Sequence, residues 1–157
     1  KGIVLDLRNN PGGLLDSSVD VSSLWIDDNQ LVVEEKRGGK SIRKLNASGD
    51  NILKGMPTVV HINSGSASAS EIVAGALSDH KVATLMGEKS YGKGSVQQVI
   101  ELSTGASLKV TIARWFTPNG KNIDKEGIKP DQEIKISDQE YKDKKDPQKD
   151  TAINKLQ

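Results

Sequence analysis

Two short apolar runs, each followed by a glycine-bearing turn and a helical pattern, constrain the fold of this chain most strongly. The first run covers residues 2–7, its turn residues 8–13 and its helical pattern residues 14–26. The second run covers residues 57–62, and after the turn at residues 63–65 apolar residues recur at helical spacing: Ala69, Ile72, Val73, Ala76 and Leu77. Such turns place backbone N–H groups at a helix N-terminus, where the helix dipole favours developing negative charge. The pattern predicts an α/β fold of mixed α+β character with two turns suited to a chemical site.

Further strands are expected between and after these two units. Residues 31–35 and 41–45 flank Arg37-Gly38-Gly39-Lys40, whose glycines supply the positive φ angles of a tight hairpin. Three more strands are expected at residues 82–86, 95–102 and 107–115, with a glycine-bearing loop at 87–94.

The composition changes beyond Ser137 to alternating charges with little that could be buried. Asp146 followed by Pro147 is typical of a helix start, and a last short helix is expected there. We therefore predict a core domain at residues 1–136 and a charged linker or solvated tail with a short C-terminal helix at residues 137–157.

Composition and charge exclude several classes of function. The 157 residues suffice for one domain, and 22 Lys and Arg nearly balance 21 Asp and Glu, so no strong positive field is available for nucleic acid. No apolar run is long enough to span a bilayer, and neither the carboxylates nor the two His residues show metal-ligand spacing. There is no cysteine to act as nucleophile or thiolate ligand. We expect no metal, no cofactor and no membrane contact, and we interpret the chain, which begins without Met, as a fragment.

Three serines at the start of the second helix are candidate nucleophiles: Ser66, Ser68 and Ser70. A serine hydroxyl needs a neighbouring base, usually His and sometimes a lysine that burial keeps neutral. His61 interrupts a strand and His80 closes a helix, so structural roles are expected for both. Lys93, between Gly92 and Gly94, could be packed closely and desolvated, but a solvated loop charge or a phosphate contact would suit the same position. The residues alone leave these alternatives open.

Several segments resemble the carboxyl-terminal processing peptidases, also called tail-specific proteases. Residues 63–77, N-S-G-S-A-S-A-S-E-I-V-A-G-A-L, look like the nucleophile segment of that family, and residues 92–97, G-K-G-S-V-Q, resemble its G-K-G-[ST]-V-Q segment. Residues 7–13, 117–120 and 127–131 are similar to further landmarks of the family, in the same order along the chain. The resemblance extends from about residue 5 to residue 131 and covers most of the chain.

The resemblance implies a serine endopeptidase that works through an acyl-enzyme. Ser68 would be the nucleophile, Lys93 the base and Gln97 the residue that orients Lys93. The N–H of Ala69 and that of Gly12 or Gly13 would form the oxyanion hole. Gln97 requires a bend at Gly94 or Ser95, since four residues of straight strand span roughly 13 Å. Glu88 is expected to point away from Lys93, because a carboxylate partner would keep the amine charged.

The family also implies a crotonase-like core of stacked β-β-α units, to which the hairpin at residues 31–45 would be peripheral. Its members act on proteins or peptides with accessible C-termini, and many carry a PDZ domain, which we do not expect in residues 1–157. By resemblance we expect a periplasmic or other extracytoplasmic location at the cell envelope. Two alternatives stay open at this point: an inactive fragment, and a non-enzymatic ligand-binding module on the same fold. Oligomeric state is not indicated by the sequence.

Overall fold

The computed structural model describes all residues, 1–157, and contains a four-stranded parallel sheet at its centre. The sheet consists of β1 (Ile3–Asp6), β4 (Thr58–Ile62), β5 (Thr84–Gly87) and β8 (Gln132–Glu133), in the order β1-β4-β5-β8. All three pairings are parallel. The mixed α/β fold predicted from the sequence is confirmed, and β8 is a strand that the sequence pattern does not predict.

A second four-stranded sheet is antiparallel, with the order β3-β2-β7-β6. Its strands are β2 (Leu31–Arg37), β3 (Lys40–Asn46), β6 (Ser95–Glu101) and β7 (Ser107–Phe116). The hairpin β2–β3 is less peripheral than expected, because β2 also pairs with β7, and Val32 and Val33 are almost wholly buried. Of the two hairpin strands, β3 is largely exposed and β2 is largely buried. The hairpin therefore contributes one strand to the core and one to the surface.

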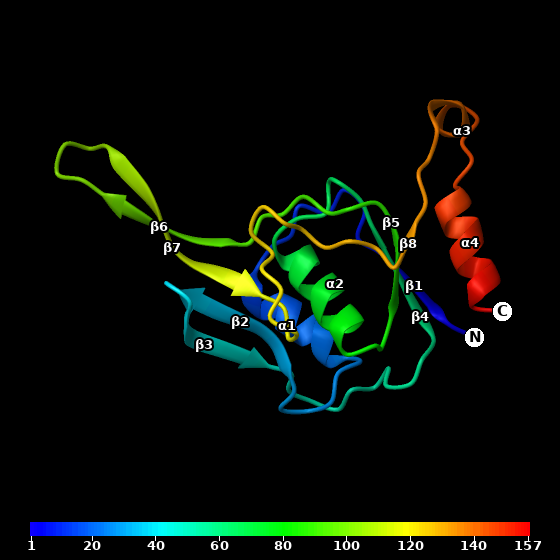
Figure 1. Ribbon diagram of the computed structural model, residues 1–157, viewed down its shortest axis with the longest axis horizontal. Helices are drawn as coiled ribbons and strands as arrows, with labels where there is room; N and C mark the ends of the chain where they lie inside the picture. Colours follow the sequence, from blue (N-terminus) through cyan, green and yellow to red (C-terminus); the bar gives the residue numbers. More distant parts are fainter.

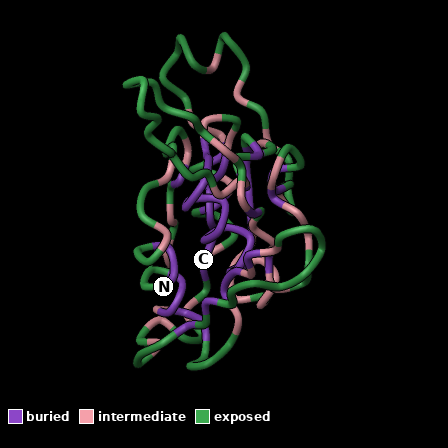
Figure 2. The backbone as a smooth tube through the Cα atoms, turned by 90° about the vertical axis from the view of Figure 1, so that its left-hand side faces the viewer, coloured by how far each residue is buried: buried purple, intermediate pink, exposed green.

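Helices α1 (Leu15–Ser23) and α2 (Ala69–Asp79) pack against each other between the two sheets (Figure 1). Every residue of α2 from 69 to 77 is buried, and the largest apolar cluster of the molecule surrounds this helix. In the tube view the buried stretches gather along the centre of the molecule, and the projecting loops are exposed (Figure 2). Helix α1 ends at Ser23, three residues earlier than predicted, and residues 24–26 form a turn that brings Trp25 and Ile26 into the core.

The C-terminal segment covers the other face of the parallel sheet. Helix α3 (Asp138–Lys142) lies in the stretch predicted to be a linker or solvated tail, and its N-cap Ser137 forms a capping box with Glu140. Helix α4 (Pro147–Lys155) begins as predicted, with Asp146 as its N-cap. Its Ala152 packs on Val59 and Met86. The tail is therefore docked, because a small apolar residue finds a partner surface on the sheet.

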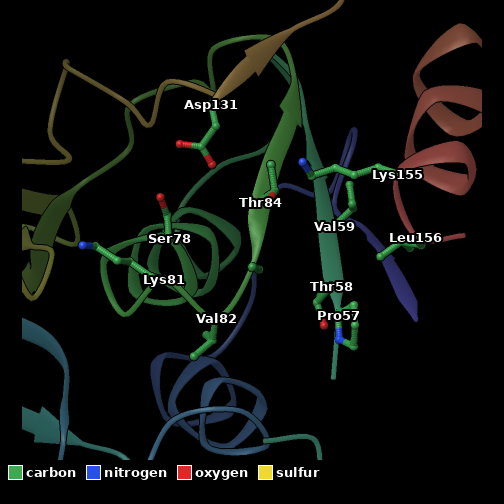
Figure 3. Close-up of a pocket in the computed structure, with 11 residues that line it drawn as sticks. Pro57, Thr58, Val59, Ser78, Lys81, Val82, Thr84, Asp131, Lys155 and Leu156 are labelled. Carbon is green, nitrogen blue, oxygen red and sulfur yellow. The ribbon is translucent and has the colours of Figure 1, made fainter. Parts of the chain in front are cut away.

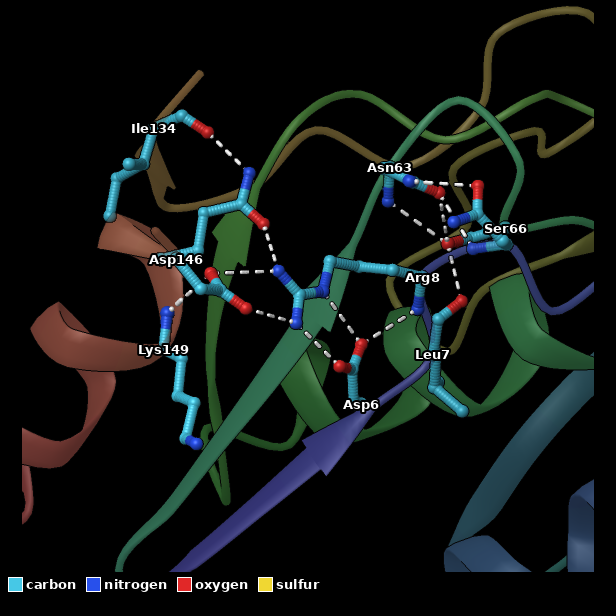
Figure 4. Close-up of polar contacts among 10 residues, drawn as sticks. Asp6, Leu7, Arg8, Asn63, Ser66, Ile134, Asp146 and Lys149 are labelled. Atoms are coloured by element: carbon cyan, nitrogen blue, oxygen red, sulfur yellow. Dashed lines mark hydrogen bonds and ion pairs between the residues drawn. The ribbon is translucent and has the colours of Figure 1, made fainter. Parts of the chain in front are cut away.

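Arg8 connects the start of α4 to the end of β1 through hydrogen bonds and ion pairs (Figure 4). Its guanidinium donates to Asp6, to Asp146 and to the side chain of Gln148, at 2.6–3.0 Å. These bonds hold the pKa of the Asp146 carboxyl below its usual range. For Asp6, burial acts to raise the pKa, but the hydrogen bonds and charge of Arg8 outweigh it and the net direction is down. The turn after β1 and the C-terminal helix are thereby joined.

His61 is buried between the parallel sheet and α4, and neither ring nitrogen has a hydrogen-bond partner. Its pKa is lowered, chiefly because burial disfavours the charged ring and also because of the nearby Arg8 charge; Asp6 and Asp146 act in the opposite direction. The proton binds better to the unfolded chain than to the folded one. Protonation of His61 therefore does not affect the free energy of unfolding above the unfolded pKa of about 6.5, and lowers it as the pH falls below that value.

Replacing His61 with leucine is expected to raise the free energy of unfolding by about 1–3 kcal/mol, because two unsatisfied buried nitrogens are removed. Urea unfolding at several pH values measures this effect, and the loss of stability as the pH falls below about 6.5 should shrink in the variant. The matched control is His80→Leu, which removes a 2.7 Å contact to the carbonyl of Leu31 and should destabilise. A less stable His61→Leu variant with an unchanged pH profile would contradict this account.

Candidate active site

Three turns that follow the C-terminal ends of adjacent parallel strands meet at one place. They follow β1 at residues 7–14, β4 at residues 63–68 and β5 at residues 88–94. In open sheets with parallel strands this edge is where ligands bind, because the loops there converge over the strand ends. All of the predicted site residues except Gln97 belong to these turns or to the first residue of α2.

Ser68 is the N-cap of α2 and has an unusual backbone conformation, with φ 57° and ψ −121°. A positive φ in a residue other than glycine is strained by about 1–3 kcal/mol and persists where the surrounding structure imposes it. Ser68 is buried, with 9% of its surface exposed, at a helix N-terminus. A strained serine between a strand and a helix is the arrangement that presents nucleophiles in other hydrolases.

Glu71 connects the Ser68 segment to the loop that carries Lys93. One carboxylate oxygen accepts hydrogen bonds from the backbone N–H groups of Ser68, at 2.9 Å, and Lys93, at 2.8 Å. The other oxygen accepts from the N–H of Gly92, at 2.7 Å, and from the hydroxyl of Ser90, at 2.5 Å. Glu71 is completely buried, so these four donors compensate its desolvation.

Neither Glu71 nor Ser90 is among the site residues predicted from the sequence. The sequence does hold a signal for Glu71, since Ser68 and Glu71 have the spacing of a capping box, in which the glutamate accepts from the N-cap N–H. Ser90 has no comparable signal. Its hydroxyl also accepts from the N–H of Ile128, at 2.7 Å, so Ser90 connects the loop to Ile128 as well as to Glu71.

The turn after β1 is hydrogen-bonded to the turn after β4. The carbonyl of Asn10 accepts from the N–H of Ala67, at 3.0 Å. The hydroxyl of Ser66 donates to the carbonyl of Leu7, at 2.7 Å, as Figure 4 shows. Asn63 accepts from the N–H of Asn9. Ser66 is therefore engaged in holding the two turns together, which leaves Ser68 as the hydroxyl at the strained position.

Gly12 and Gly13 differ sharply in their surroundings. Gly12 has φ +94°, and a Cβ there would lie 2.6 Å from the carbonyl oxygen of Ala67 and 2.7 Å from the nitrogen of Ala69. Its N–H is already donated to the Asn10 side chain, at 3.0 Å. A Cβ on Gly13 would meet nothing within 4 Å, and the N–H groups of Gly13 and Ala69 make no hydrogen bond in the structure.

Gly12→Ala is expected to lower the free energy of unfolding by about 2–4 kcal/mol, from the positive φ together with overpacking against backbone atoms. The matched substitution Gly13→Ala should change it by no more than about 0.5 kcal/mol. Thermal or urea unfolding of the two variants measures the difference. Equal effects of the two substitutions would show that the close approach of Gly12 to the backbone of Ala67 and Ala69 is wrong.

Lys93 is exposed, so of the alternatives that the sequence leaves open, close packing of the amine between its flanking glycines is not observed. Gly92 and Gly94 are buried, but they admit backbone from residues 123–127: a Cβ on Gly94 would lie within 3 Å of Ile123 and Asp124. The glycines thus pack the loop rather than the lysine side chain. Glu88 and Lys93 form no ion pair in the structure.

Gln97 is exposed on β6 and pairs with Thr111. The bend expected at Gly94 or Ser95 is instead an irregularity of strand register between Val96 and Gln97. The side chains of Ser68, Lys93 and Gln97 are not joined by hydrogen bonds. What the structure brings together is the Ser68 segment, the backbone of Lys93 and the two glycines of the first turn.

A mainly apolar cavity of about 250 Å³ adjoins this place. Its walls include Gly12, Gly13 and Ala69 together with apolar side chains: Leu5, Leu7, Leu14, Val21 and Val73. A larger cavity of about 390 Å³ lies elsewhere, at the start of β4 and β5, between the ends of α2 and α4 (Figure 3). No cluster of His, Asp or Glu could hold a metal ion, and no helix has the length and apolar character needed to cross a membrane.

The fold and the sequence both match known proteases. The solved photosystem II D1 C-terminal processing protease superposes with a TM-score of 0.80 at 41% identity, covering 85% of this chain and 34% of that one. A sequence model of peptidase family S41 matches residues 1–134, and the chain belongs to this family.

Two curated relatives are similar over most of the chain. The carboxyl-terminal-processing protease of Synechocystis sp. is 47% identical over 133 residues, which is 85% of this chain and 31% of that protein. The carboxy-terminal processing protease CtpA of Bacillus subtilis is 43% identical over 140 residues, or 88% of this chain and 29% of that protein. The chain thus spans about a third of the length of these relatives.

Proposed function

We propose that this chain is the catalytic core of a serine endopeptidase of the carboxyl-terminal processing type, with Ser68 as nucleophile and Lys93 as general base. The observation that carries the proposal is the Glu71 carboxylate, which binds the backbone N–H groups of both residues. Such a bond pair would fix the main-chain positions from which a nucleophile and a base could meet. The protease names of the relatives do not favour the non-enzymatic alternative.

The proposed mechanism begins with attack of the Ser68 oxygen on a peptide carbonyl, while neutral Lys93 takes the hydroxyl proton. The N–H groups of Ala69 and Gly13 would stabilise the resulting oxyanion; we choose Gly13 because the N–H of Gly12 is already donated to Asn10. Lys93 would then return the proton to the leaving amine, and the acyl-enzyme forms. Water, deprotonated by Lys93, would release the acyl group and regenerate Ser68.

Two parts of this arrangement would be completed by a substrate. Lys93 is exposed in the free protein, and a polypeptide lying over the site would exclude water and favour the neutral amine. Rotation of the Lys93 side chain would then bring it to Ser68, with Gln97 as a positioning residue for its amine. The backbone bonds of Glu71 need not change in this step.

The substrates that we propose are proteins or peptides with accessible C-termini, as the names of the relatives indicate for those proteins. The apolar cavity beside Gly13 and Ala69 would take the side chain that precedes the scissile bond. An extracytoplasmic location at the cell envelope is part of the same proposal. Core residues 1–136 would carry the chemistry, with the C-terminal helix as an added support.

Peptides with lysine or aspartate before the scissile bond should be cleaved with a kcat/KM at least about 10²-fold lower than that for valine, because no charged side chain lines the mainly apolar cavity. Hydrolysis of a peptide set that varies only this residue measures the preference. Equal rates for charged and apolar residues would exclude the cavity as the binding place for that side chain.

The experiment that tests the proposed function is hydrolysis of denatured casein by the 157-residue chain. The rate is measured from the release of free amino groups. Hydrolysis that disappears in a folded Lys93→Ala variant supports the proposal. Hydrolysis that survives in this variant, or a folded parent chain that cleaves neither casein nor the apolar peptide set, would contradict it.

A further inference from the structure

The hairpin β6–β7 projects from the body of the molecule (Figure 1). Strand β7 pairs with β2 only through Arg114–Phe116, whereas its pairing with β6 continues outward to Ser107. The outer hairpin, residues 97–111, is therefore a two-stranded ribbon. Ribbons of this kind are only marginally stable without a further partner.

One face of the outer hairpin is apolar. Ile100 lies opposite Leu108, and Gln98 lies opposite Val110, so these four side chains share a face, on which Leu102 follows two residues after Ile100. Ile100, Leu102 and Leu108 are 42%, 45% and 49% exposed. The other face carries mostly polar side chains, among them Glu101 and Lys109. The apolar face is thus partnered by nothing within the chain.

The outer edge of β6 presents free backbone groups. The N–H of Leu102 donates to the carbonyl of Ala106, at 2.8 Å, so the backbone groups of Leu102 face β7. Because these groups alternate along an antiparallel strand, those of Val99 and Glu101 face away from β7. No strand pairs with β6 on that side, and its seven residues contain no proline and one charge. Natural edge strands usually carry more protection than this.

The edge begins beside the proposed active site. Strand β6 starts at Ser95, two residues after Lys93, whose backbone is bonded to Glu71 together with that of Ser68. From Ser95 to Glu101 the strand covers roughly 20 Å. An extended chain paired along this edge would therefore have one end at the site.

We propose that the free edge of β6 binds an extended segment of the polypeptide substrate as an added strand, with apolar side chains of that segment against Ile100, Leu102 and Leu108. This inference rests on the proposed function for the identity of the ligand. A second copy of the chain is the less suitable occupant, because a two-stranded face roughly 20 Å long and roughly 10 Å wide offers far less than the roughly 800 Å² per partner of a stable dimer. Strand addition supplies affinity through main-chain bonds and tolerates varied sequences.

The test measures binding without catalysis. The folded Ser68→Ala variant is titrated against a fluorescein-labelled peptide of alternating valine and serine, about twelve residues long, which exceeds the seven residues of β6. Adding Val99→Pro removes an outward N–H without removing a β6–β7 bond, and affinity should fall about tenfold or more. The matched Val99→Ala keeps the N–H and should bind within about threefold of the parent.

A second arm leaves the protein unchanged. The same peptide with alternate amides N-methylated should bind about tenfold more weakly, since it cannot pair along one edge. Equal binding of the methylated and unmethylated peptides in both possible registers would overturn the inference. So would sedimentation showing that the chain dimerises and that Val99→Pro makes it monomeric, because the edge would then belong to a second copy.

Failure of the inference and failure of the proposed function give different results. Edge-dependent binding in a chain that hydrolyses nothing supports the inference and contradicts the function. If the chain hydrolyses casein but its affinity for the peptide is unchanged by Val99→Pro and by N-methylation, the function is supported and the inference is overturned.

Discussion

Replacing Ser68 with alanine is expected to lower kcat for peptide hydrolysis by about 10⁴–10⁶, the range in which removal of a nucleophile falls in other serine proteases. The substitution removes one oxygen from a position whose backbone is held by Glu71 and by the start of α2, so the fold should be retained. Hydrolysis rates together with circular dichroism measure both effects. Ser64→Ala, an exposed serine in the turn before α2, is the matched control, and it should retain most of the activity.

Replacing Lys93 should also lower kcat for peptide hydrolysis. Two substitutions distinguish the role of its positive charge from its role as a base. Lys93→Ala removes both, whereas Lys93→Arg keeps the positive charge but has a guanidinium that stays protonated. Both should lower kcat by at least about 10³ if proton transfer is the role. Lys89→Ala, in the same loop and exposed, is the control. Activity in Lys93→Arg close to that of the parent would mean that the charge, not the base, matters.

Replacing Glu71 with glutamine is expected to lower the free energy of unfolding by about 2–5 kcal/mol. The amide nitrogen cannot accept hydrogen bonds, so the donors that face it lose their partner in a fully buried place. Urea unfolding measures the loss. Glu88→Gln is the control, because the Glu88 carboxylate makes no hydrogen bond or ion pair in the structure.

Glu71→Gln should also lower kcat by about 10²-fold with a smaller change in KM, since small displacements of reacting groups have effects of this size. The split between kcat and KM distinguishes a positioning residue from one that only stabilises the fold. A variant with reduced stability but parental kcat, measured well below its unfolding temperature, would limit Glu71 to a structural role.

The parts of the fold that local sequence patterns specify are predictable. The strand–turn–helix units, α2 and the start of α4 follow from spacing, glycine turns and the Asp146-Pro147 pair. Pairing between distant segments is not predictable in this way. Strand β2 joins β7 although some eighty residues separate Glu35 from Trp115, and Arg8 reaches Asp146, which lies 138 residues away. Periodicity within one segment holds no information about such partners.

The candidate site shows the same division. The hydroxyl cluster and Lys93 can be picked out because residue type and family segments mark them. The role of Glu71 in joining two segments of the site cannot be predicted from the sequence. Its hydrogen-bond donors belong to Ser90, Gly92 and Lys93, which approach α2 only in the folded chain. The sequence leaves open whether Lys93 is buried or solvated for a related reason: which group enters the space left by a glycine depends on distant backbone at residues 123–127.

The most direct test of the central claim, that Ser68 is the nucleophile, is to trap the acyl-enzyme. The chain is incubated with a p-nitrophenyl ester of an acylated valine, quenched in acid, digested and mapped by mass spectrometry. We predict the acyl mass on Ser68, and its absence from this position in Ser68→Ala. An acyl group on Ser66 or Ser70 instead, or peptide hydrolysis that persists in Ser68→Ala, would contradict the account.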